Sequence, residues 1–301
     1  MLDYPLVAAV AAVLREGSFE RAAEALHLTP SAVSQRVKLI EERLGQPLVV
    51  RGTPCTATAA GAVLARHAEA LHLLEAELAE ALPGLGEGAA PTLPLAINAD
   101  SLATWFMPAL ARLGAERGWL FDLRLEDQDH TAEQLARGEV LAAVTALATP
   151  QRGCRSLALG ALRYRATASP AFVARHFAEG VNAATLARAP CLVFNRQDRL
   201  QERWIQAHLG RPLVVPRHWL PASQAFVDAA LAGLGWGLNP EPLVQELLAR
   251  GALVDLPGAA PVDVPLHWQT LRAAERLLQP LSSAVAEAAR AVLHLEKEPR
   301  A

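Results

Sequence analysis

The chain has 301 residues, of which 52% are hydrophobic and 20% are charged, so it can form two or three buried cores and is not globally disordered. The formal net charge of -3 excludes a uniformly basic protein that coats nucleic acid, but it allows a local basic face. The longest stretch without Asp, Glu, Lys or Arg has 14 residues, Gly52 to Ala65, whereas a membrane-spanning helix needs about 20 apolar residues. The first residues lack the basic start and cleavage site of a signal peptide, and the three cysteines form no Cys-x-x-Cys pair. We therefore expect a cytoplasmic protein without a membrane segment, disulfide framework, metal site or cofactor.

The N-terminal 80 residues have apolar residues at helical spacing. A first predicted helix over residues 3–15 is followed by a second over residues 19–26, with Ser18 as its N-cap. A tight turn then places Thr29 as the N-cap and Pro30 at the first position of a third helix. Two short helices joined by such a turn are typical of a helix-turn-helix unit.

The third predicted helix runs from Ser31 to Leu44 and has one apolar and one polar face. The polar face has hydroxyl, amide and cationic groups that suit phosphates and base edges in a major groove. After Gly45 the sequence predicts a strand and a turn through Arg51 and Thr53, which resemble a wing beside a recognition helix. On periodicity alone, a helical bundle with a solvated face is the alternative. The polar positions on the helix are Ser31, Ser34, Gln35, Arg36 and Lys38.

A long helix is predicted over residues 58–82, with Leu64, Leu71 and Leu78 spaced seven residues apart. This spacing forms a stripe that suits a partner helix, and the alternative is a helix that folds back on its own domain. The Gly- and Pro-rich segment that follows, residues 82–91, predicts a linker.

Beyond the linker, short apolar runs alternate with helical patterns, which predicts an α/β region with a mostly parallel sheet. Its length of roughly 210 residues favours two lobes. We expect strands at 93–97, 119–125, 140–146, 191–194, 235–238, 252–256 and 264–269, and helices at 101–116, 131–137, 198–208, 222–232, 241–249 and 273–293.

Polar residues follow several of these strands, so a parallel sheet would bring them to one crevice. A helix that begins where the first strand ends favours a carboxylate at its free N–H groups, and the acidic residues favour a cation. This combination is complementary to an amino acid with a basic side chain. The alternatives are helix capping by Asp100 and Asp198 and a surface charge at Glu126. The candidate effector residues from this pattern are Asn98, Asp100, Ser101, Leu102, Glu126, Asp127, Thr145 and Asp198.

Three segments of the N-terminal region resemble the winged helix-turn-helix of LysR-type transcriptional regulators. They are Gly17-Ser-Phe-Glu-Arg-Ala-Ala23, Leu28-Thr-Pro-Ser-Ala-Val-Ser-Gln-Arg-Val-Lys38 and Leu44-Gly-x-Pro-Leu-Val-x-Arg51. The resemblance implies a dimerisation helix after the winged domain and a two-lobed sensor domain like that of periplasmic binding proteins. It also implies DNA contacts from Ser18, Thr29, Pro30, Ser31, Ser34, Gln35, Arg36, Lys38, Arg51 and Thr53.

The sensor region resembles the LysG/ArgP-like branch of that family, which controls lysine and arginine export. The similar segments are Asn98–Trp105, Leu125–Asp127, Arg137–Thr145 and Gly233–Leu238. Members of the branch carry Glu where this chain has Gln224, which weakens one contact to a ligand amine. The resemblance implies a homodimeric or homotetrameric activator that binds double-stranded DNA and lysine or arginine, with RNA polymerase as a further partner. The alternatives are a LysR-type regulator for another small carboxylate or amino acid, and an α/β solute-binding protein.

No pattern in the sequence predicts an enzyme. There is no G-x-S-x-G segment and no H-x-x-x-H spacing, and Gly233–Gly237 lies between a helix and a strand, the reverse of the order in a dinucleotide-binding loop. The predicted division is a DNA-binding domain (1–58), a dimerisation helix with its linker (59–91) and an effector-binding domain (92–301). Within the last, lobe I is expected at about 92–163 and 268–301, and lobe II at about 164–267.

Overall fold

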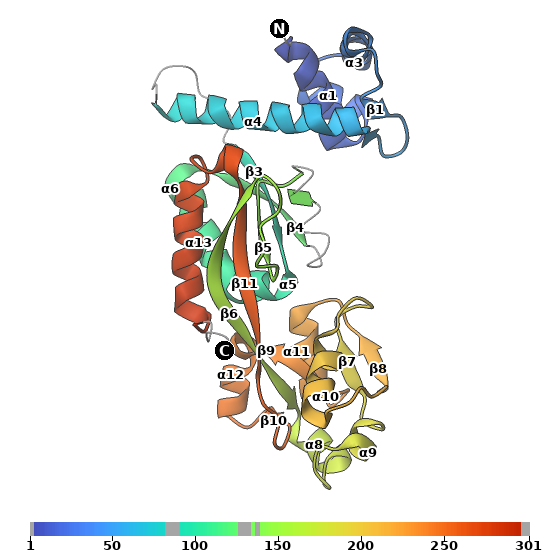
Figure 1. Ribbon diagram of the computed structural model, residues 1–301, viewed down its shortest axis with the longest axis vertical. Helices are drawn as coiled ribbons and strands as arrows, with labels where there is room; N and C mark the ends of the chain where they lie inside the picture. The colour runs from blue at the N-terminus through green and yellow to red at the C-terminus, as the bar shows by residue number, and fades with distance from the viewer. Residues whose placement is uncertain (1–2, 82–90, 126–133, 136–138, 296–301) are drawn as a thin grey trace.

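The structure is a computed structural model that describes residues 3–81, 91–125, 134–135 and 139–295. It has an N-terminal helical domain, a long helix and a two-lobed α/β region (Figure 1). The first part comprises α1 (Tyr4–Glu16), α2 (Phe19–Ala25), α3 (Pro30–Leu44), the wing strands β1 (Val49–Val50) and β2 (Thr56–Ala57), and the long helix α4 (Ala59–Ala81).

The predicted helix boundaries of the N-terminal domain are confirmed by their caps. Gly17 and Gly45 end α1 and α3 in left-handed conformations, with φ of 66° and 67°. Thr29 caps α3, and Val33 and Val37 of that helix are almost fully buried. The wing is attached to α3 because the Glu41 carboxylate accepts hydrogen bonds from the N–H groups at the start of the wing.

The first turns of the long helix α4 pack against α1. This packing corrects the prediction that Leu64 belongs to the dimer interface. Leu64 is only 7% exposed and packs in the core of its own N-terminal domain, so it is not available to a partner helix. Leu71 is half-buried and Leu78 is 50% exposed. Leu74, one turn before Leu78, is also exposed. Among the three leucines of the predicted stripe, exposure therefore increases toward the end of α4.

Over the residues that the structure describes, the main sheet has seven strands and is mixed, so the expectation of a mostly parallel sheet is wrong. Only the β3–β4 and β3–β5 pairs are parallel, and β6 and β11 run antiparallel to each other along their whole shared length. The strands are β3 (Thr92–Ile97), β4 (Leu120–Leu125), β5 (Ala142–Thr145), β6 (Cys154–Ala168), β9 (Gly237–Pro240), β10 (Val254–Asp255) and β11 (Val262–Leu271), and a separate parallel pair is formed by β7 (Cys191–Val193) and β8 (Arg217–Trp219).

Within the described ranges, ten further named helical segments surround these strands. Those of lobe I are α5 (Ala99–Ser101), the π-helix η1 (Leu102–Phe106), α6 (Met107–Arg117), the 3-10 helix η2 (Arg272–Ala274) and α13 (Gln279–Val292). Those of lobe II are α8 (Pro170–His176), α9 (Ala183–Leu186), α10 (Leu200–Leu209), α11 (Ser223–Leu231) and α12 (Glu241–Ala249). The sequence did not predict α8, α9, β6 or β8, and the helix expected at 131–137 lies almost entirely outside the described residues.

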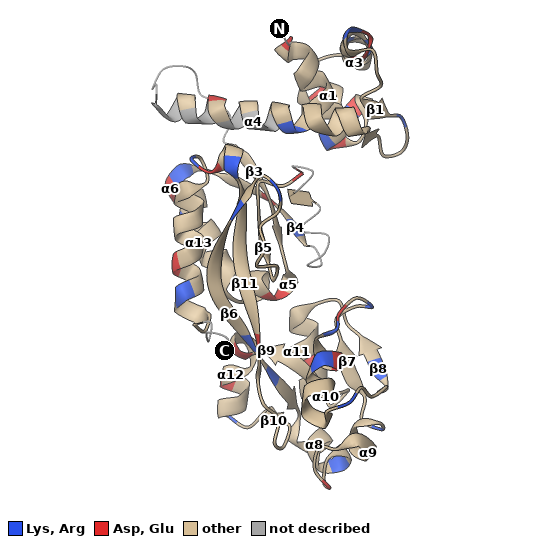
Figure 2. Cartoon of the chain, in the orientation of Figure 1, with Lys and Arg blue, Asp and Glu red and all other residues tan. Residues whose placement is uncertain are grey.

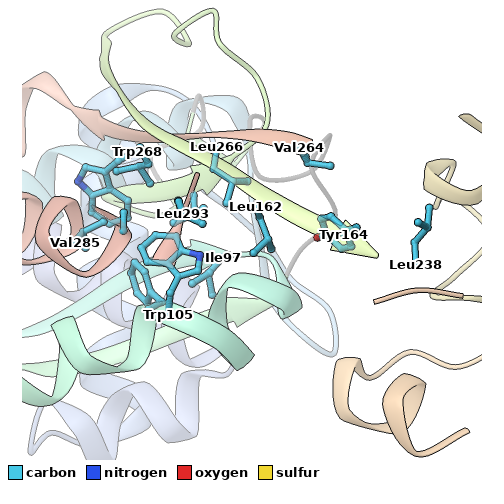
Figure 3. Packing of buried hydrophobic residues seen from close by; sticks show 14 of the residues in the cluster. Ile97, Trp105, Leu162, Tyr164, Leu238, Val264, Leu266, Trp268, Val285 and Leu293 are labelled. Atoms are coloured by element: carbon cyan, nitrogen blue, oxygen red, sulfur yellow. The ribbon is translucent and has the colours of Figure 1, made fainter. Parts of the chain in front are cut away.

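Strand β6 belongs to both lobes. Its first part pairs with β11 in lobe I, and from Tyr164 onward it pairs with β9 and β10 in lobe II. Buried side chains follow it from Trp105 and Trp268 in lobe I through Leu162 to Tyr164 (Figure 3). The lobe limits within β6 and β11 stay a prediction.

At the opposite end of lobe I, helix η2 lies next to α4 and follows directly after β11. No helix of the described ranges is both long and apolar enough to span a bilayer. The three cysteines, Cys55, Cys154 and Cys191, are all buried free thiols. Burial raises the pKa of the Cys154 and Cys191 thiols, which opposes formation of the reactive thiolate.

Candidate functional site

The recognition helix α3 presents a polar face to solvent. Ser31, Gln35 and Lys38 are exposed, whereas Ser34 and Arg36 are half-buried beside the core. The Lys38 ammonium lies 3.6 Å from a Glu42 carboxylate oxygen, an exposed pair that leaves the cation accessible. Cationic residues of this helix lie at the end of the molecule away from the sensor lobes (Figure 2).

Two of the predicted DNA residues cap helices. The Ser18 hydroxyl accepts hydrogen bonds from the N–H groups of Glu20 and Arg21, at 3.2 and 3.3 Å. The Thr29 hydroxyl accepts from the N–H of Ala32 at 3.2 Å. These bonds fix the starts of α2 and α3, so a DNA contact by either hydroxyl would add to a structural role.

The wing lies beside the second helix. The Arg51 guanidinium lies 5.0 Å from the centre of the Phe19 ring, which orients this cation. Thr53, at the tip of the wing, and Pro30, at the start of α3, are both exposed. All ten predicted DNA residues therefore lie on the recognition helix, on the helix starts around it or on the wing.

A cleft of about 840 Å³ lies between the two lobes. Five of the predicted effector residues line it: Asn98, Asp100, Leu102, Asp198 and Gln224. Leu125 also lines it at the end of β4, but the predicted residues that follow, Glu126 and Asp127, lie outside the described part of the chain.

Two predicted effector residues do not line the cleft. Ser101, the last residue of α5, is fully buried. Thr145 is 2% exposed because β5 pairs with β11 at this point, opposite His267, and its hydroxyl accepts a hydrogen bond from the N–H of Leu147. The mixed sheet thus places Thr145 inside the sheet, and this corrects the expectation that a parallel sheet would bring it to the crevice.

The Asp100 carboxylate is at the centre of the cleft. Tyr164 donates a hydrogen bond to Oδ2 at 2.7 Å, and Ser223 donates one to Oδ1 at 2.5 Å. Burial raises the pKa of Asp100, the two hydroxyl hydrogen bonds lower it, and the nearby Asp198 charge raises it further. Burial and the adjacent Asp100 charge hold the pKa of Tyr164 well above its usual value, so Tyr164 remains a hydrogen-bond donor.

Asp198 organises the loop that forms the lobe II side of the cleft. Its carboxylate accepts hydrogen bonds from the N–H groups of Phe194, at 3.1 Å, and Leu200, at 2.8 Å. The capping interpretation of Asp198 therefore fits the structure. A carboxylate has about four acceptor positions, so these two bonds leave capacity for a ligand.

Further polar groups of the cleft were not predicted from the sequence. Gln201 is 4% exposed, and its Oε1 has no hydrogen-bond partner among the described residues. The same holds for Oδ1 of Asn98, which the sequence did predict. Arg199 and Arg203 also line the cleft, and Arg199 pairs with Glu202. The cleft therefore has carboxylates, guanidinium groups and amides, a combination suited to a zwitterion.

Gln224 lies on the exposed side of α11, where its amide donates a hydrogen bond to Asp228 at 3.1 Å. It lines the cleft but adds no charge to it. Across the described residues, no group of three or more His, Cys, Asp or Glu is arranged to hold a metal ion.

A winged helix-turn-helix joined to a two-lobed domain with a cleft of ligand size defines a ligand-responsive transcriptional regulator. Residues 6–62 match the family model described as bacterial regulatory helix-turn-helix protein, lysR family, and residues 86–294 match the LysR substrate binding domain. The chain belongs to the LysR family of transcriptional regulators, which confirms the resemblance of its N-terminal segments.

The relatives confirm the similarity to the LysG/ArgP-like branch. The chain is 49% identical to the HTH-type transcriptional regulator ArgP of Pseudomonas aeruginosa over 283 residues, 94% of each chain. It is 44% identical over 288 residues to LysG of Mycobacterium tuberculosis, covering 96% of this chain and 94% of the relative.

Two solved structures share the whole architecture. The crystal structure of ArgP from Mycobacterium tuberculosis has a TM-score of 0.85 and 43% identity, and the match covers 98% of this chain and 100% of that one. Full-length LysG from Corynebacterium glutamicum with bound effector Arg has a TM-score of 0.76 and 37% identity, with coverage of 97% and 100%.

Proposed function

We propose that this chain regulates transcription in response to lysine or arginine bound in the interlobe cleft, and that it activates the gene of an amino-acid exporter. The observation that carries this proposal is that two carboxylates, Asp100 and Asp198, and two guanidinium groups, Arg199 and Arg203, line the same cleft. The effector-bound LysG structure supports it, since that relative has the same two-lobed architecture.

The charges of the cleft suggest how such a ligand would bind. Arg203, with the helix starts nearby, would take the α-carboxylate, because guanidinium groups bind carboxylates with good geometry. Asp100 and Asp198 would take ammonium groups at the lone pairs that their present hydrogen bonds leave unused. Glu126 and Asp127, which follow β4 in the sequence, would add negative charge for the basic side chain. Binding would favour one arrangement of the lobes and so change how the paired DNA-binding domains sit on the operator.

The test is thermal unfolding and calorimetry of the full-length chain with a panel of L-amino acids. L-lysine or L-arginine should raise the unfolding temperature, because a ligand that binds only the folded state stabilises it. D-lysine and the diamine cadaverine are matched controls, since they disturb or remove the carboxylate while keeping the cation. Stabilisation by a neutral amino acid alone would contradict a basic effector but leave the regulator intact.

The recognition helix gives a prediction about sequence preference. Gln35→Ala should reduce the preference for the operator by about 1–3 kcal/mol, because an amide gives a donor and an acceptor to a base edge. Lys38→Ala should instead weaken operator and random DNA about equally and lower the salt dependence of binding. Mobility shifts with both DNAs at several salt concentrations separate the two. Equal proportional losses for both variants would show that the helix is oriented differently in the groove.

The exposed part of α4 gives a prediction about assembly into a homodimer or a dimer of dimers. Leu78→Asp should shift the chain toward monomer in light scattering, because a buried helix interface would then contain an unpaired carboxylate. Val214→Asp is the matched control, since Val214 is 85% exposed between α10 and β8, and both of these elements lie far from α4 (Figure 1). An unchanged molar mass for Leu78→Asp would exclude this helix face from the interface. RNA polymerase is proposed as a partner of the assembled form.

A further inference from the structure

One side-chain hydrogen bond joins the lobes inside the cleft. Ser223 is the first residue of α11 in lobe II, and its hydroxyl donates to Oδ1 of Asp100, at the start of the lobe I helix, at 2.5 Å. The other carboxylate oxygen accepts from Tyr164, on the strand shared by both lobes, at 2.7 Å. One carboxylate thus connects both lobes and the strand between them.

The surroundings of this bond favour its persistence. Ser223 is 7% exposed and Tyr164 is 5% exposed, so water competes little for either hydroxyl. Hydrogen bonds to a charged acceptor are shorter and stronger than those between neutral groups. Opening the cleft would leave the Ser223 hydroxyl without the carboxylate and would remove one of the two donors that compensate the buried charge.

We propose that Ser223 and Asp100 form a clasp that holds the lobes closed before any effector binds, and that Tyr164 positions Asp100 for it. Ser223 and Tyr164 are then positioning residues that set the population of closed lobes. A ligand that binds the closed form binds with an apparent affinity proportional to that population. Loss of the clasp should therefore weaken every effector by the same factor, whereas loss of a direct ligand contact would change the ranking among effectors.

The first arm of the test needs no ligand. In the full-length chain, spin labels at Ala111→Cys on α6 and Val214→Cys on lobe II report the distance between the lobes, since both positions are exposed and the natural cysteines are buried. Dilution with unlabelled chains removes distances between subunits. Ser223→Ala should broaden the distribution and shift it to longer distances. An unchanged distribution would overturn the clasp.

The second arm measures binding and rests on the proposed function. Ser223→Ala should weaken lysine and arginine by the same factor, about ten- to a hundredfold, the range expected for one hydrogen bond to a charged group. A changed lysine-to-arginine ratio with unchanged lobe distances would overturn the clasp and make Ser223 a direct ligand contact. If no basic amino acid binds the unmodified chain, the proposed effector fails, but the first arm still decides the clasp.

The matched control is Ser169→Ala. Ser169 is a serine of lobe II with 8% exposure that caps α8 through the N–H of Phe172, and its hydroxyl bond is local to that helix. It should lower stability without changing the lobe distance or the effector affinity. Ser223→Cys gives a second variant of nearly the same shape with a weaker donor. Its interlobe distance and its effector affinity should both lie between those of Ser223→Ala and of the unmodified chain.

Discussion

Replacing Gly61 with alanine should destabilise the N-terminal domain by about 3 kcal/mol or more, at the upper end of what overpacking costs. Gly61 lies in the first turn of α4, against the wing. A Cβ atom there would overlap the carbonyl oxygen of Leu48 and lie 2.8 Å from its carbonyl carbon. These are backbone atoms, so no side-chain rotation relieves the overlap.

The backbone on both sides of this contact is held in place. The N–H of Leu48 donates to the Glu41 carboxylate at 2.8 Å, and its carbonyl oxygen accepts from the N–H of Thr58 at 3.1 Å. The N–H of Gly61 donates to the Thr58 hydroxyl at 3.0 Å. Separating α4 from the wing would therefore break several hydrogen bonds as well as the packing of a fully buried leucine.

Urea unfolding and operator binding of the full-length chain measure this effect. Gly114→Ala is the control, because Gly114 lies inside α6 and a Cβ there would be 3.7 Å from its nearest neighbour, an ordinary contact. That change should be neutral or stabilising by up to about 1 kcal/mol, since alanine favours a helix over glycine. Equal stability of the two variants would mean that α4 can move away from the wing at little cost.

Asp100→Ala should weaken lysine or arginine binding by about ten- to a hundredfold, the loss expected for a charge-assisted hydrogen bond. It should also lower the free energy of unfolding by about 1–3 kcal/mol, because the buried Tyr164 hydroxyl loses its acceptor. Asp100→Asn keeps the shape and one acceptor oxygen, so it should lose most of the binding but less of the stability.

Calorimetry gives the affinity, and denaturant unfolding gives the stability. Asp122→Ala is the control for removing a lobe I carboxylate, because the Asp122 side chain is 51% exposed and pairs with Arg124 at the surface. It should change neither quantity by much. If Asp100→Ala bound a basic amino acid as well as the unmodified chain, Asp100 would have only its structural role.

The N-terminal domain could be predicted from the sequence because its signals are local. Ser18 and Thr29 cap helices with their own side chains, and Gly17 and Gly45 end helices by adopting a positive φ. The sensor sheet could not be predicted in the same way. The apolar run of strand β6, residues 157–162, consists of leucine, alanine and glycine, of which alanine and glycine disfavour strands, and its continuation alternates Arg163 and Arg165 with buried residues. Without that strand, the alternation of strands and helices pointed to a parallel sheet.

The sequence predicted cleft residues that directly follow a strand. It did not predict those on the strand that passes from one lobe to the other. Asn98 and Asp100 follow β3 directly, and the sequence pattern located both. Tyr164 lies on the unpredicted strand, and its alternation with Leu162 and Ala166 on the buried side was the available signal. The contact between Ser223 and Asp100 joins residues 123 positions apart, and no local pattern encodes such a distance.

Strand β11 has a mechanical consequence for the whole regulator. It lines the cleft at Val264, runs through lobe I with one shift of register against β6 between Leu266 and His267, and continues into η2, which lies next to α4. From Val264 to η2 the strand spans about 25 Å, so a tilt of about 5° at the cleft would displace η2 by about 2 Å. A displacement at the cleft would therefore be transmitted along the strand to the residues that contact the long helix. The stiffness of β11, as well as the affinity of the cleft for its ligand, would determine how far ligand binding displaces α4 and the DNA-binding domain.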